Sequence, residues 1–438
     1  MSFSNVESRI LDPVFDRSGL RVEFRLPAET AFLSDLRLIN IGLTSTSATD
    51  SPNPLLGVLA SIKRVQILDG STMLDQINVA TLYNAFRSAN QVNDSNLSMN
   101  RFLKYVRTGY VFQGDFSINA GNQFNVGEPV IKEQNPNTYT ANAIDSKRAW
   151  ISLKDLLPFL RSSLVLPTTV FKQLRVVVEY NSSAEMKFLT RDSTATKVSS
   201  ADALLLAEEV GDGDMKDALM REYKGAVYRP IESEQVIAPA ITGLANVAGQ
   251  GTKAQQNSYL LTGANGKRLI KMAVIQTPTD STTWLNAGGV AGDVKSTGSL
   301  ASVAQFKTRV QVDVNGVPKL PSAGMVASNT GSCGNRRLAY LNDSWGLFNI
   351  LPAQNEINYS THRTQKFFDD NLVDSVGQQD YIGIMIDDNI QELKLHYDRT
   401  GVEGNANLNQ QLQLNCLYEV EKAIVMNNDM TYNVIYTQ

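Results

Sequence analysis

Apolar and polar residues alternate in many short segments of this chain, which is the pattern of half-buried β-strands. The clearest segment covers residues 411–420. Its apolar set comprises Leu412, Leu414, Cys416, Tyr418 and Val420. Its polar set comprises Gln411, Gln413, Asn415 and Glu419. The alternation predicts a strand with one face on a core and the other face in a polar setting.

Similar strands are predicted throughout the chain, between Pro, Gly, Asn or Asp residues. They cover residues 21–26, 36–43, 174–180, 203–210, 227–236, 267–275, 381–386 and 392–397. Helical periodicity is confined to residues 78–89, residues 153–161 and a short segment that begins near Asp214. Residues 238–266 and 280–302 show no periodicity and are expected to form long surface loops. The sequence therefore predicts an all-β protein with a few short helices.

A strand–turn–strand motif occurs twice, about 245 residues apart. Residues 62–75 read IKRVQILDGSTMLD, and residues 306–320 read FKTRVQVDVNGVPKL. In both, Arg-Val-Gln precedes an Asp-Gly or Asn-Gly pair, whose residues readily take the positive φ angles of a tight hairpin turn. Asp69-Gly70 and Asn315-Gly316 are therefore expected at equivalent places in two copies of one β-domain.

Length and composition agree with a duplicated domain. The chain has 438 residues, 42% of them hydrophobic and 19% charged, which is enough apolar material for two cores of about 200 residues each. The acidic, glycine-bearing stretch at residues 208–217 is the predicted boundary. We expect a first barrel over residues 1–212, a linker with a short helix over residues 213–226 and a second barrel over residues 227–438.

Charge and targeting features exclude several classes of protein. The net charge is −4, and the N-terminal 25 residues balance four arginines against four carboxylates, so direct nucleic-acid binding is not expected. No apolar run is long enough for a transmembrane helix, and the N-terminus lacks the features of a signal peptide. Only two cysteines are present, which fits synthesis in a reducing compartment. The first 15 or so residues are expected to be poorly ordered alone and to pack against a neighbour on the inward face of an assembly.

Four segments together resemble the double jelly-roll major capsid proteins of icosahedral DNA viruses, a family that includes tectivirus-type phage coats, adenovirus hexon and the coats of large nucleocytoplasmic viruses. The first is the hairpin at residues 62–75 with the helix after it, and the second is residues 151–180. The third is residues 203–236, which resemble the end of the first barrel and the link to the second. The fourth is residues 414–436, which resemble the family's last two strands around a polar turn.

The resemblance implies two tandem jelly-roll β-barrels. It also implies a homotrimer that forms a pseudo-hexagonal capsomer, because two similar barrels per copy place six around a threefold axis. Such capsomers would tile the shell of a virion and contact neighbouring capsomers, minor capsid or penton proteins and, in some shells, an internal membrane. The protein would be made in the host cell cytoplasm and located in the virion.

Candidate catalytic residues are few. His362 lies among serines and threonines without a nucleophile motif, and His396 shares the polar face of its strand with Lys394, so a surface histidine is favoured over a catalytic base at both positions. Cys416 belongs to the apolar set of its strand and is expected in the core. Cys333 is expected in a loop and unpaired. We predict no enzymatic activity and no catalytic residues.

Cofactor and metal motifs are also incomplete. Residues 288–297 (GGVAGDVKST) lack the adjacent Gly-Lys, the preceding strand and the following helix of a phosphate loop. Residues 212–217 (DGDMKD) lack the glycine of a calcium loop. The carboxylate pairs 369–370 and 387–388 are sequence neighbours, which point to opposite faces when they lie in a strand. No cofactor-binding or metal site is predicted.

Two alternatives share the strand pattern. A β-sandwich that binds a receptor or carbohydrate, as in a viral spike or lectin, would be expected to expose aromatic residues in its loops. The two predicted loops offer only Tyr259 and Trp284. A β-sandwich hydrolase is disfavoured by the scarcity of histidine and the absence of a nucleophile motif.

Overall fold

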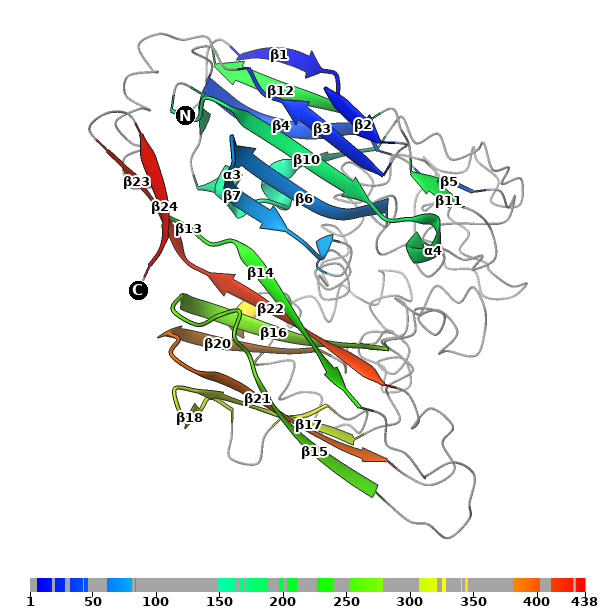
Figure 1. Cartoon of the computed structure of the whole chain (residues 1–438), viewed down its shortest axis with the longest axis vertical. Coiled ribbons are helices and arrows are strands. Elements are labelled where there is room, and N and C mark those ends of the chain that lie inside the picture. Colours follow the sequence, from blue (N-terminus) through cyan, green and yellow to red (C-terminus); the bar gives the residue numbers. More distant parts are fainter. Residues whose placement is uncertain are drawn as a thin grey trace, which may run out of the picture.

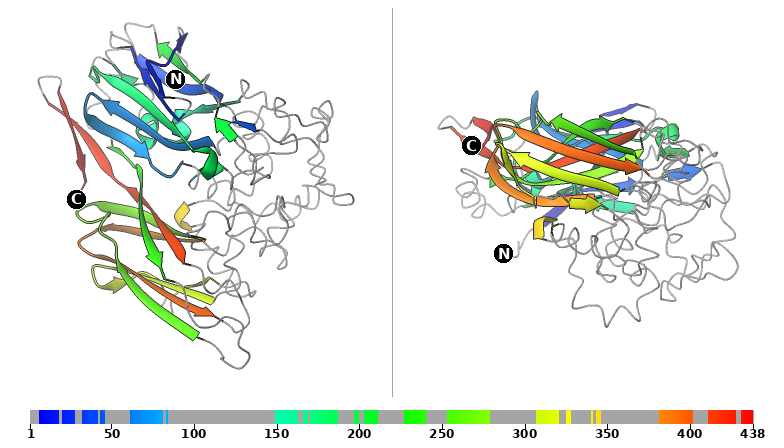
Figure 2. Two further views of the ribbon diagram at one scale, coloured as in Figure 1. Left: turned by 45° about the vertical axis from the view of Figure 1, so that its right-hand side comes forward. Right: turned by 90° about the horizontal axis from the view of Figure 1, so that it is seen from below.

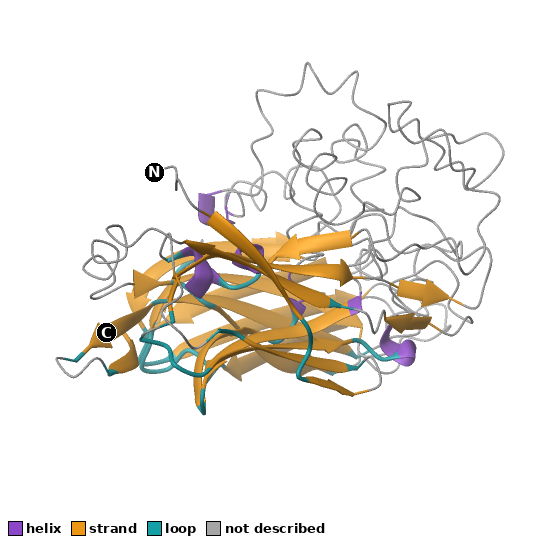
Figure 3. Cartoon of the chain, turned by 90° about the horizontal axis from the view of Figure 1, so that it is seen from above, coloured by secondary structure: helices purple, strands orange, loops and turns teal. Residues whose placement is uncertain are grey.

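Regular structure in the computed structural model is almost entirely β (Figure 3). The structure describes residues 6–17, 20–27, 32–41, 43–45, 61–80, 83, 149–162, 166–168, 170–186, 197–199, 203–210, 227–239, 253–278, 307–320, 325–327, 340, 343–345, 381–401, 411–427 and 431–437. The helical elements with defined ends in this part of the chain are short: η6 (Leu153–Asp155), α3 (Pro158–Arg161) and α4 (Ser183–Met186).

Two sheets form a first barrel from the N-terminal half of the chain (Figure 1). The β1 sheet has the order β1-β12-β4-β8, with β9 beside β4. Its strands are β1 (Val6–Leu11), β12 (Leu204–Val210), β4 (Phe32–Ile41), β8 (Ala149–Ser152) and β9 (Leu166–Pro167). The β10 sheet has the order β2-β3-β10-β6-β7. Its strands are β2 (Phe15–Arg17), β3 (Arg21–Arg25), β10 (Leu174–Tyr180), β6 (Ile62–Asp69) and β7 (Thr72–Ile77). A separate pair joins β5 (Leu43–Ser45) to β11 (Lys197–Ser199).

Two further sheets form a second barrel from the C-terminal half. The β14 sheet has the order β14-β22-β16-β20. Its strands are β14 (Ile231–Ala238), β22 (Leu412–Val420), β16 (Arg268–Pro278) and β20 (Tyr381–Asn389). The β21 sheet has the order β15-β21-β17-β18, with β19 beside β17. Its strands are β15 (Lys253–Leu260), β21 (Leu393–Gly401), β17 (Lys307–Val314), β18 (Val317–Pro318) and β19 (Met325–Ala327).

The two barrels repeat one strand order. In each barrel, the first strand pairs with the last strand. The last strand also pairs with an earlier strand on its other side, β4 in the order β1-β12-β4 and β16 in the order β14-β22-β16. The opposite sheet places a hairpin at its edge, β6–β7 in the first barrel and β17–β18 in the second. Eight antiparallel strands in two such sheets form a jelly roll. The predicted fold, two jelly-roll barrels in tandem, is confirmed.

Each barrel has its own core, because the inward side chains of its two sheets interdigitate. The second core contains apolar residues of β16, β17, β20, β21 and β22. The first core contains those of β3, β4, β6, β7, β10 and β12, together with residues from the second half of the chain. Two of the views show the barrels one above the other (Figures 1 and 2). The division at residues 212 and 226 stays a prediction, because residues 211–226 lie outside the described part.

Both predicted hairpins are present, but their turns differ by one residue. In the second hairpin Val314 pairs with Val317, and Asn315 and Gly316 have φ angles of 51° and 80°. In the first hairpin Asp69 is the last strand residue and pairs with Thr72, so Gly70, with a φ of 58°, is the first of two turn residues. A β-bulge in this hairpin shifts the register, and the prediction of a positive φ for Asp69 was therefore wrong.

Several other predictions need correction. Residues 253–260 of the expected loop form β15, because a polar edge strand can be held by its backbone pairing with β21 alone. The first 15 or so residues were expected to be poorly ordered alone, yet residues 6–11 form β1 and pair along their whole length with β12. The helix expected over 153–161 is split into η6 and α3 at Leu156–Leu157, ahead of Pro158. Of the segment 78–89 that was expected to be helical, Ala80 and Tyr83 are helical, residues 78 and 79 form a turn, and the remaining positions lie outside the described residues, as does the segment near Asp214.

Strand β22 also departs from its prediction in one respect. Leu414, Cys416, Tyr418 and Val420 face the second core, as the alternation predicted. The opposite face is not a solvated surface, because Leu417 is buried in the first barrel's cluster and Asn415 is buried beside it. The first barrel covers this side of the β14 sheet, so β22 is buried on both faces.

The two turn glycines generate a test. Replacing Gly70 or Gly316 by Val places a β-branched residue at a positive φ, which L-residues rarely adopt, and we expect each variant to lose about 1–3 kcal/mol of stability. No atom outside the turn lies within 4 Å of a Cβ at Gly316, so the loss there would report the backbone alone. Thermal unfolding measures the effect, with Ser71→Val as the control. Unchanged midpoints for both glycine variants would contradict the assigned turns.

Candidate functional site: the junction between the barrels

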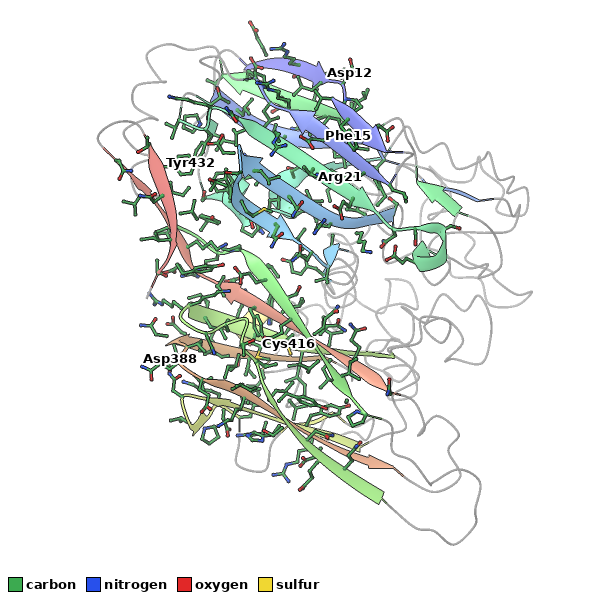
Figure 4. All side chains as sticks on the ribbon, in the orientation of Figure 1. Asp12, Phe15, Arg21, Asp388, Cys416 and Tyr432 are labelled. Carbon is green, nitrogen blue, oxygen red and sulfur yellow. The ribbon has the colours of Figure 1, made fainter. Side chains whose placement is uncertain are left out.

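The residues considered for catalysis do not converge in the structure. His396 Nε2 lies 2.9 Å from Asp313 Oδ2 on the outer face of the β21 sheet, as expected for a hydrogen-bonded surface histidine. Cys416 is buried in the second barrel, and burial raises the pKa of its thiol to about 12 (Figure 4). Asp387 and Asp388 form ion pairs with Arg268 at 3.1 Å and Lys319 at 3.2 Å.

Other candidates lie outside the described residues: His362, Cys333, and residues 212–217, 288–297 and 369–370. Among the described residues, no three His, Cys, Asp or Glu side chains are grouped so that they could hold a metal ion. The same part of the chain contains no helix that is both long and apolar enough to cross a membrane.

The most elaborate arrangement of side chains lies instead where the two barrels meet. A third small sheet, β13-β23-β24, lies beside both barrels in two views (Figures 1 and 2). It consists of β13 (Val227–Tyr228), β23 (Lys422–Met426) and β24 (Tyr432–Tyr436). We call it the clasp sheet, because its strands contact residues of both barrels. The alternation of β24 turns Tyr432 and Val434 toward the first core and leaves Asn433 and Ile435 exposed.

Aromatic rings join the clasp sheet to the first barrel. Phe159 of α3 packs edge-to-face against Tyr228 at a centroid distance of 5.3 Å and against Phe171 at 5.6 Å. Phe171 in turn packs against Tyr432 at 4.7 Å. Each such pair contributes about 0.5–1.5 kcal/mol beyond the burial of its surface. The chain of four rings therefore fixes β13 and β24 on the underside of the first barrel.

Two tyrosine hydroxyls add directional contacts to the same hairpin, β6–β7. The hydroxyl of Tyr432 donates to Asp69 Oδ2 at 2.7 Å, and that of Tyr228 donates to the carbonyl oxygen of Leu74. Asp69 also accepts a hydrogen bond from the backbone N–H of Gln173 at 2.6 Å. The repeated hairpin of the first barrel is thus the element that the clasp sheet binds.

A buried carboxyl group lies next to these contacts. The bulge in β7 places Leu74 and Asp75 in succession inside the protein, and Asp75 is almost fully buried. Its two oxygens accept hydrogen bonds from the backbone N–H groups of Phe159 and Gln76, both at 2.8 Å. Burial raises the pKa of Asp75 to about 7, although these two hydrogen bonds and the nearby Lys422 and Arg161 act in the opposite direction.

The other end of β24 is tied to the second barrel. The hydroxyl of Tyr436 donates to Glu232 Oε1 at 2.6 Å, and Lys267 and Lys422 both lie 4.6 Å from the centre of its ring. Lys267 also contacts Glu232 at 2.6 Å, and the hydrogen bonds from Lys267 and Tyr436 help to lower the pKa of that carboxyl group despite its burial. One strand therefore carries a tyrosine contact to the first barrel at its start and to the second barrel at its end.

Apolar contact between the barrels completes the junction. On the outer side of the β14 sheet, Ala273, Ile275 and Leu417 are fully buried and belong to the first barrel's cluster. Strand β14 also contacts β7 of the first barrel. Trp345 covers part of the same side, donating from Nε1 to the carbonyl oxygen of Met272 at 3.2 Å and lying over Lys271. The two barrels are therefore joined by apolar, aromatic and hydrogen-bonded contacts.

The sequence did not predict this junction. Phe159, Phe171, Tyr228 and Tyr432 are separated by up to 273 positions, and each is also explained as an ordinary core residue of its own strand or helix. Asp75 follows a predicted turn, where a carboxylate is usually exposed. The available signal was the resemblance of residues 62–75, 151–180, 203–236 and 414–436 to a known family, which identified the segments but not their contacts.

Comparison with known proteins identifies the fold. No protein-family model and no curated protein matches the sequence. Among solved structures, the chain is similar to PBCV-1 VP54 fitted into a reconstruction of the virophage Sputnik, with a TM-score of 0.56, 9% identity and coverage of 100% of this chain and 98% of the other. It is also similar to a chain of the Sputnik virophage, with a TM-score of 0.52, 9% identity and coverage of 100% and 89%. At these identities the comparisons show a shared double jelly-roll fold.

The contribution of the clasp sheet to stability can be tested at Tyr432. Tyr432→Phe removes the hydrogen bond to Asp69, and we expect a loss of about 1 kcal/mol. Tyr432→Ala also removes the ring that packs on Phe171, so its loss should reach about 3 kcal/mol. Denaturant unfolding measures both, and Asn433→Ala, an exposed neighbour on the same strand, is the control. Equal effects of all three variants would contradict the assigned role of Tyr432.

The raised pKa of Asp75 predicts that the free energy of unfolding depends on pH. Because its pKa is about 7 in the folded protein and about 4 in an unfolded chain, the folded state retains a proton that the unfolded state releases between these values. The stabilising effect is complete below about pH 4 and is lost as the pH rises through 7, by on the order of 4 kcal/mol. Asp75→Asn should remove this decline, so the wild-type and variant curves of unfolding free energy against pH should converge toward acid. Parallel curves from pH 4 to 8 would contradict the assignment.

Proposed function

We propose that this protein is a structural major capsid protein, and that three copies form a pseudo-hexagonal capsomer that tiles the shell of an icosahedral DNA virus. The observation that carries the proposal is the tandem repeat itself. Two barrels of the same strand order are joined through a buried junction, so each chain supplies two equivalent units in a fixed relative position. Three such chains provide six similar units around one axis.

The shared fold supports this proposal. Solved structures that resemble the chain over its whole length are described as PBCV-1 VP54, the PBCV-1 virus capsid and the Sputnik virophage. Fold alone does not establish function, because one fold can serve several roles. The additional support is the character of the junction, whose contacts are apolar, aromatic and structural. Such contacts hold the two barrels of one chain in a fixed relative position.

The proposed partners follow from this role. Capsomers would contact neighbouring capsomers and minor capsid or penton proteins, and an internal membrane could lie beneath the shell. The protein would be made in the host cell cytoplasm and reside in the virion. No enzymatic role is proposed. Direct contact with nucleic acid is not proposed either, because the N-terminal 25 residues balance four arginines against four carboxylates.

The rival function, a β-sandwich that binds a receptor or carbohydrate, has less support. Such a protein would present clustered aromatic side chains to its ligand. The exposed aromatic residues identified in the described part of the chain are Phe15 on β2 and Tyr436 on β24. Phe15 belongs to the first barrel and Tyr436 to the clasp sheet, so they do not form a cluster. The ring of Tyr436 also lies beside Lys267 and Lys422.

The proposal is tested by oligomeric state. Light scattering coupled to gel filtration is expected to give a mass of about three times 48.1 kDa at micromolar protein concentration. Negative-stain images of the same peak should show six-sided particles. A monomer under these conditions would contradict the capsomer and favour the receptor- or carbohydrate-binding alternative.

A further inference from the structure

The clasp sheet ends in an edge strand. Its strand order is β13-β23-β24, so β24 pairs with β23 on one side and, within the described part of the chain, with no strand on the other. Figures 1 and 2 show the clasp sheet at the periphery of the two barrels. A strand in this position presents backbone N–H and C=O groups that can pair with another chain.

The hydrogen bonds of the β23–β24 hairpin show which backbone groups point to the open edge. The N–H of Asn427 donates to the carbonyl oxygen of Thr431 at 2.8 Å. Hydrogen-bonded pairs alternate along an antiparallel ladder, so every second residue after Thr431 also bonds to β23. The bond at the far end of the strand, from the N–H of Thr437, has the same phase. The residues between them, which include Val434 and Tyr436, therefore turn their N–H and C=O groups to the open edge.

This edge lacks the features that prevent pairing between chains. Proteins protect edge strands with charged residues, proline or bulges. Residues 431–438 contain no charged residue, proline or glycine, and all pairs of β23 with β24 follow one register. By contrast, β1 carries Glu7 and Arg9, and β20 carries Asp387 and Asp388. Of the strands that end a sheet in the described part of the chain, β24 is the longest without a charged residue.

The open edge is complementary to itself. In an antiparallel pair related by a twofold axis at Val434, this residue lies opposite its own copy, and the N–H and C=O groups of the two valines bond each other. The same register places Tyr432 opposite Tyr436 of the second copy, and aromatic cross-strand pairs stabilise sheets. It places Asn433 opposite Ile435, a side chain that is 48% exposed in the single chain. Because the strand is uncharged, no like charges meet at the axis.

We infer that β24 of one copy pairs with β24 of a second copy around this axis, so that two clasp sheets of three strands join into one sheet of six. The contact uses the same surface on both copies, as a twofold interface requires. It goes beyond the proposed trimer, which closes around a threefold axis, and it links one capsomer to another.

A rival contact is available on the same sheet. Val227, Val425 and Ile435 lie on the outer side of the clasp sheet and are 49%, 42% and 48% exposed. Two copies that packed these sides face to face would also bury apolar surface. Face-to-face packing does not use the backbone groups of the edge, so it does not set Asn433 opposite Ile435. The two contacts are therefore distinguished by the register.

Charge pairs at two exposed positions test the register. Asn433 and Ile435 are both exposed, and the inferred pairing sets each opposite the other across the axis. The double variant Asn433→Lys with Ile435→Lys therefore opposes like charges twice and should abolish pairing. The double variant Asn433→Glu with Ile435→Lys is the matched control, because it opposes unlike charges twice at the same positions and should retain pairing.

Sedimentation velocity over a range of protein concentrations measures the association. A pair of short strands is a weak contact, so we expect wild type to be a trimer at micromolar concentration and to form larger species as the concentration rises. The Lys/Lys variant should stay at the mass of three chains, whereas the Glu/Lys variant should again form the larger species. Loss of association in both variants would show face-to-face packing and overturn the inference.

The outcomes also separate this inference from the proposed capsomer. Wild type that passes from one chain to two as the concentration rises, with the same response of the two variants, would support pairing at β24 and contradict the trimer. Wild type that stays at three chains at every concentration would support the trimer and contradict pairing at β24.

Disulfide formation provides a second measurement that does not depend on charge. One protein carries Asn433→Cys and another carries Ile435→Cys, both in a Cys333→Ser background where the buried Cys416 is the remaining native thiol. The inferred register makes these positions a non-hydrogen-bonded pair, whose Cα atoms lie about 4.5 Å apart, within the range of a disulfide.

Oxidation of a mixture of the two cysteine variants should therefore yield linked pairs of chains on a non-reducing gel. Either variant alone should remain unlinked, because each position lies opposite the other and not opposite its own copy. Linked chains from a single variant, or none from the mixture, would contradict the pairing of β24 around Val434.

Discussion

Burial of both sides of the β14 sheet is the constraint on which the arrangement of the two barrels depends. One side of this sheet fills the second core, as in any jelly roll. The other side carries Ala273, Ile275 and Leu417, which water would solvate poorly, and it is covered by the first barrel. Because these residues are buried in the first barrel's cluster, part of the second barrel's surface is completed by the first barrel.

The clasp sheet makes the arrangement specific. Apolar burial favours contact between the barrels but tolerates sliding, since it has little directional character. The hydrogen bonds of Tyr432 with Asp69 and of Tyr436 with Glu232 fix one strand to both barrels. Asp75 is held beneath the same hairpin by two backbone N–H groups, where a charged carboxylate would be costly. The junction therefore combines apolar burial, which has little directional character, with a few hydrogen-bonded groups that require one geometry.

Residue type alone does not mark which side of an edge strand faces a core. Val6 and Ile10 of β1 alternate with polar neighbours like the residues of any strand, yet both side chains are exposed. The distinction between core side and outer side becomes visible only when the register of β1 with β12 is known.

Local patterns in the sequence were sufficient for the strands and the two hairpins, because alternation and turn residues act over a few positions. The double jelly-roll class was implied by the resemblance of four segments to a known family. Local patterns were also sufficient for the burial of Cys416 and the surface position of His396. The junction, the positive φ of Gly70 rather than Asp69, the burial of Asp75 and the second buried side of β22 were decided by tertiary structure. Each depends on a bulge, a register or a covering barrel contributed by residues far away in the chain, and the identity of a single residue carries no information about which distant surface will lie against it.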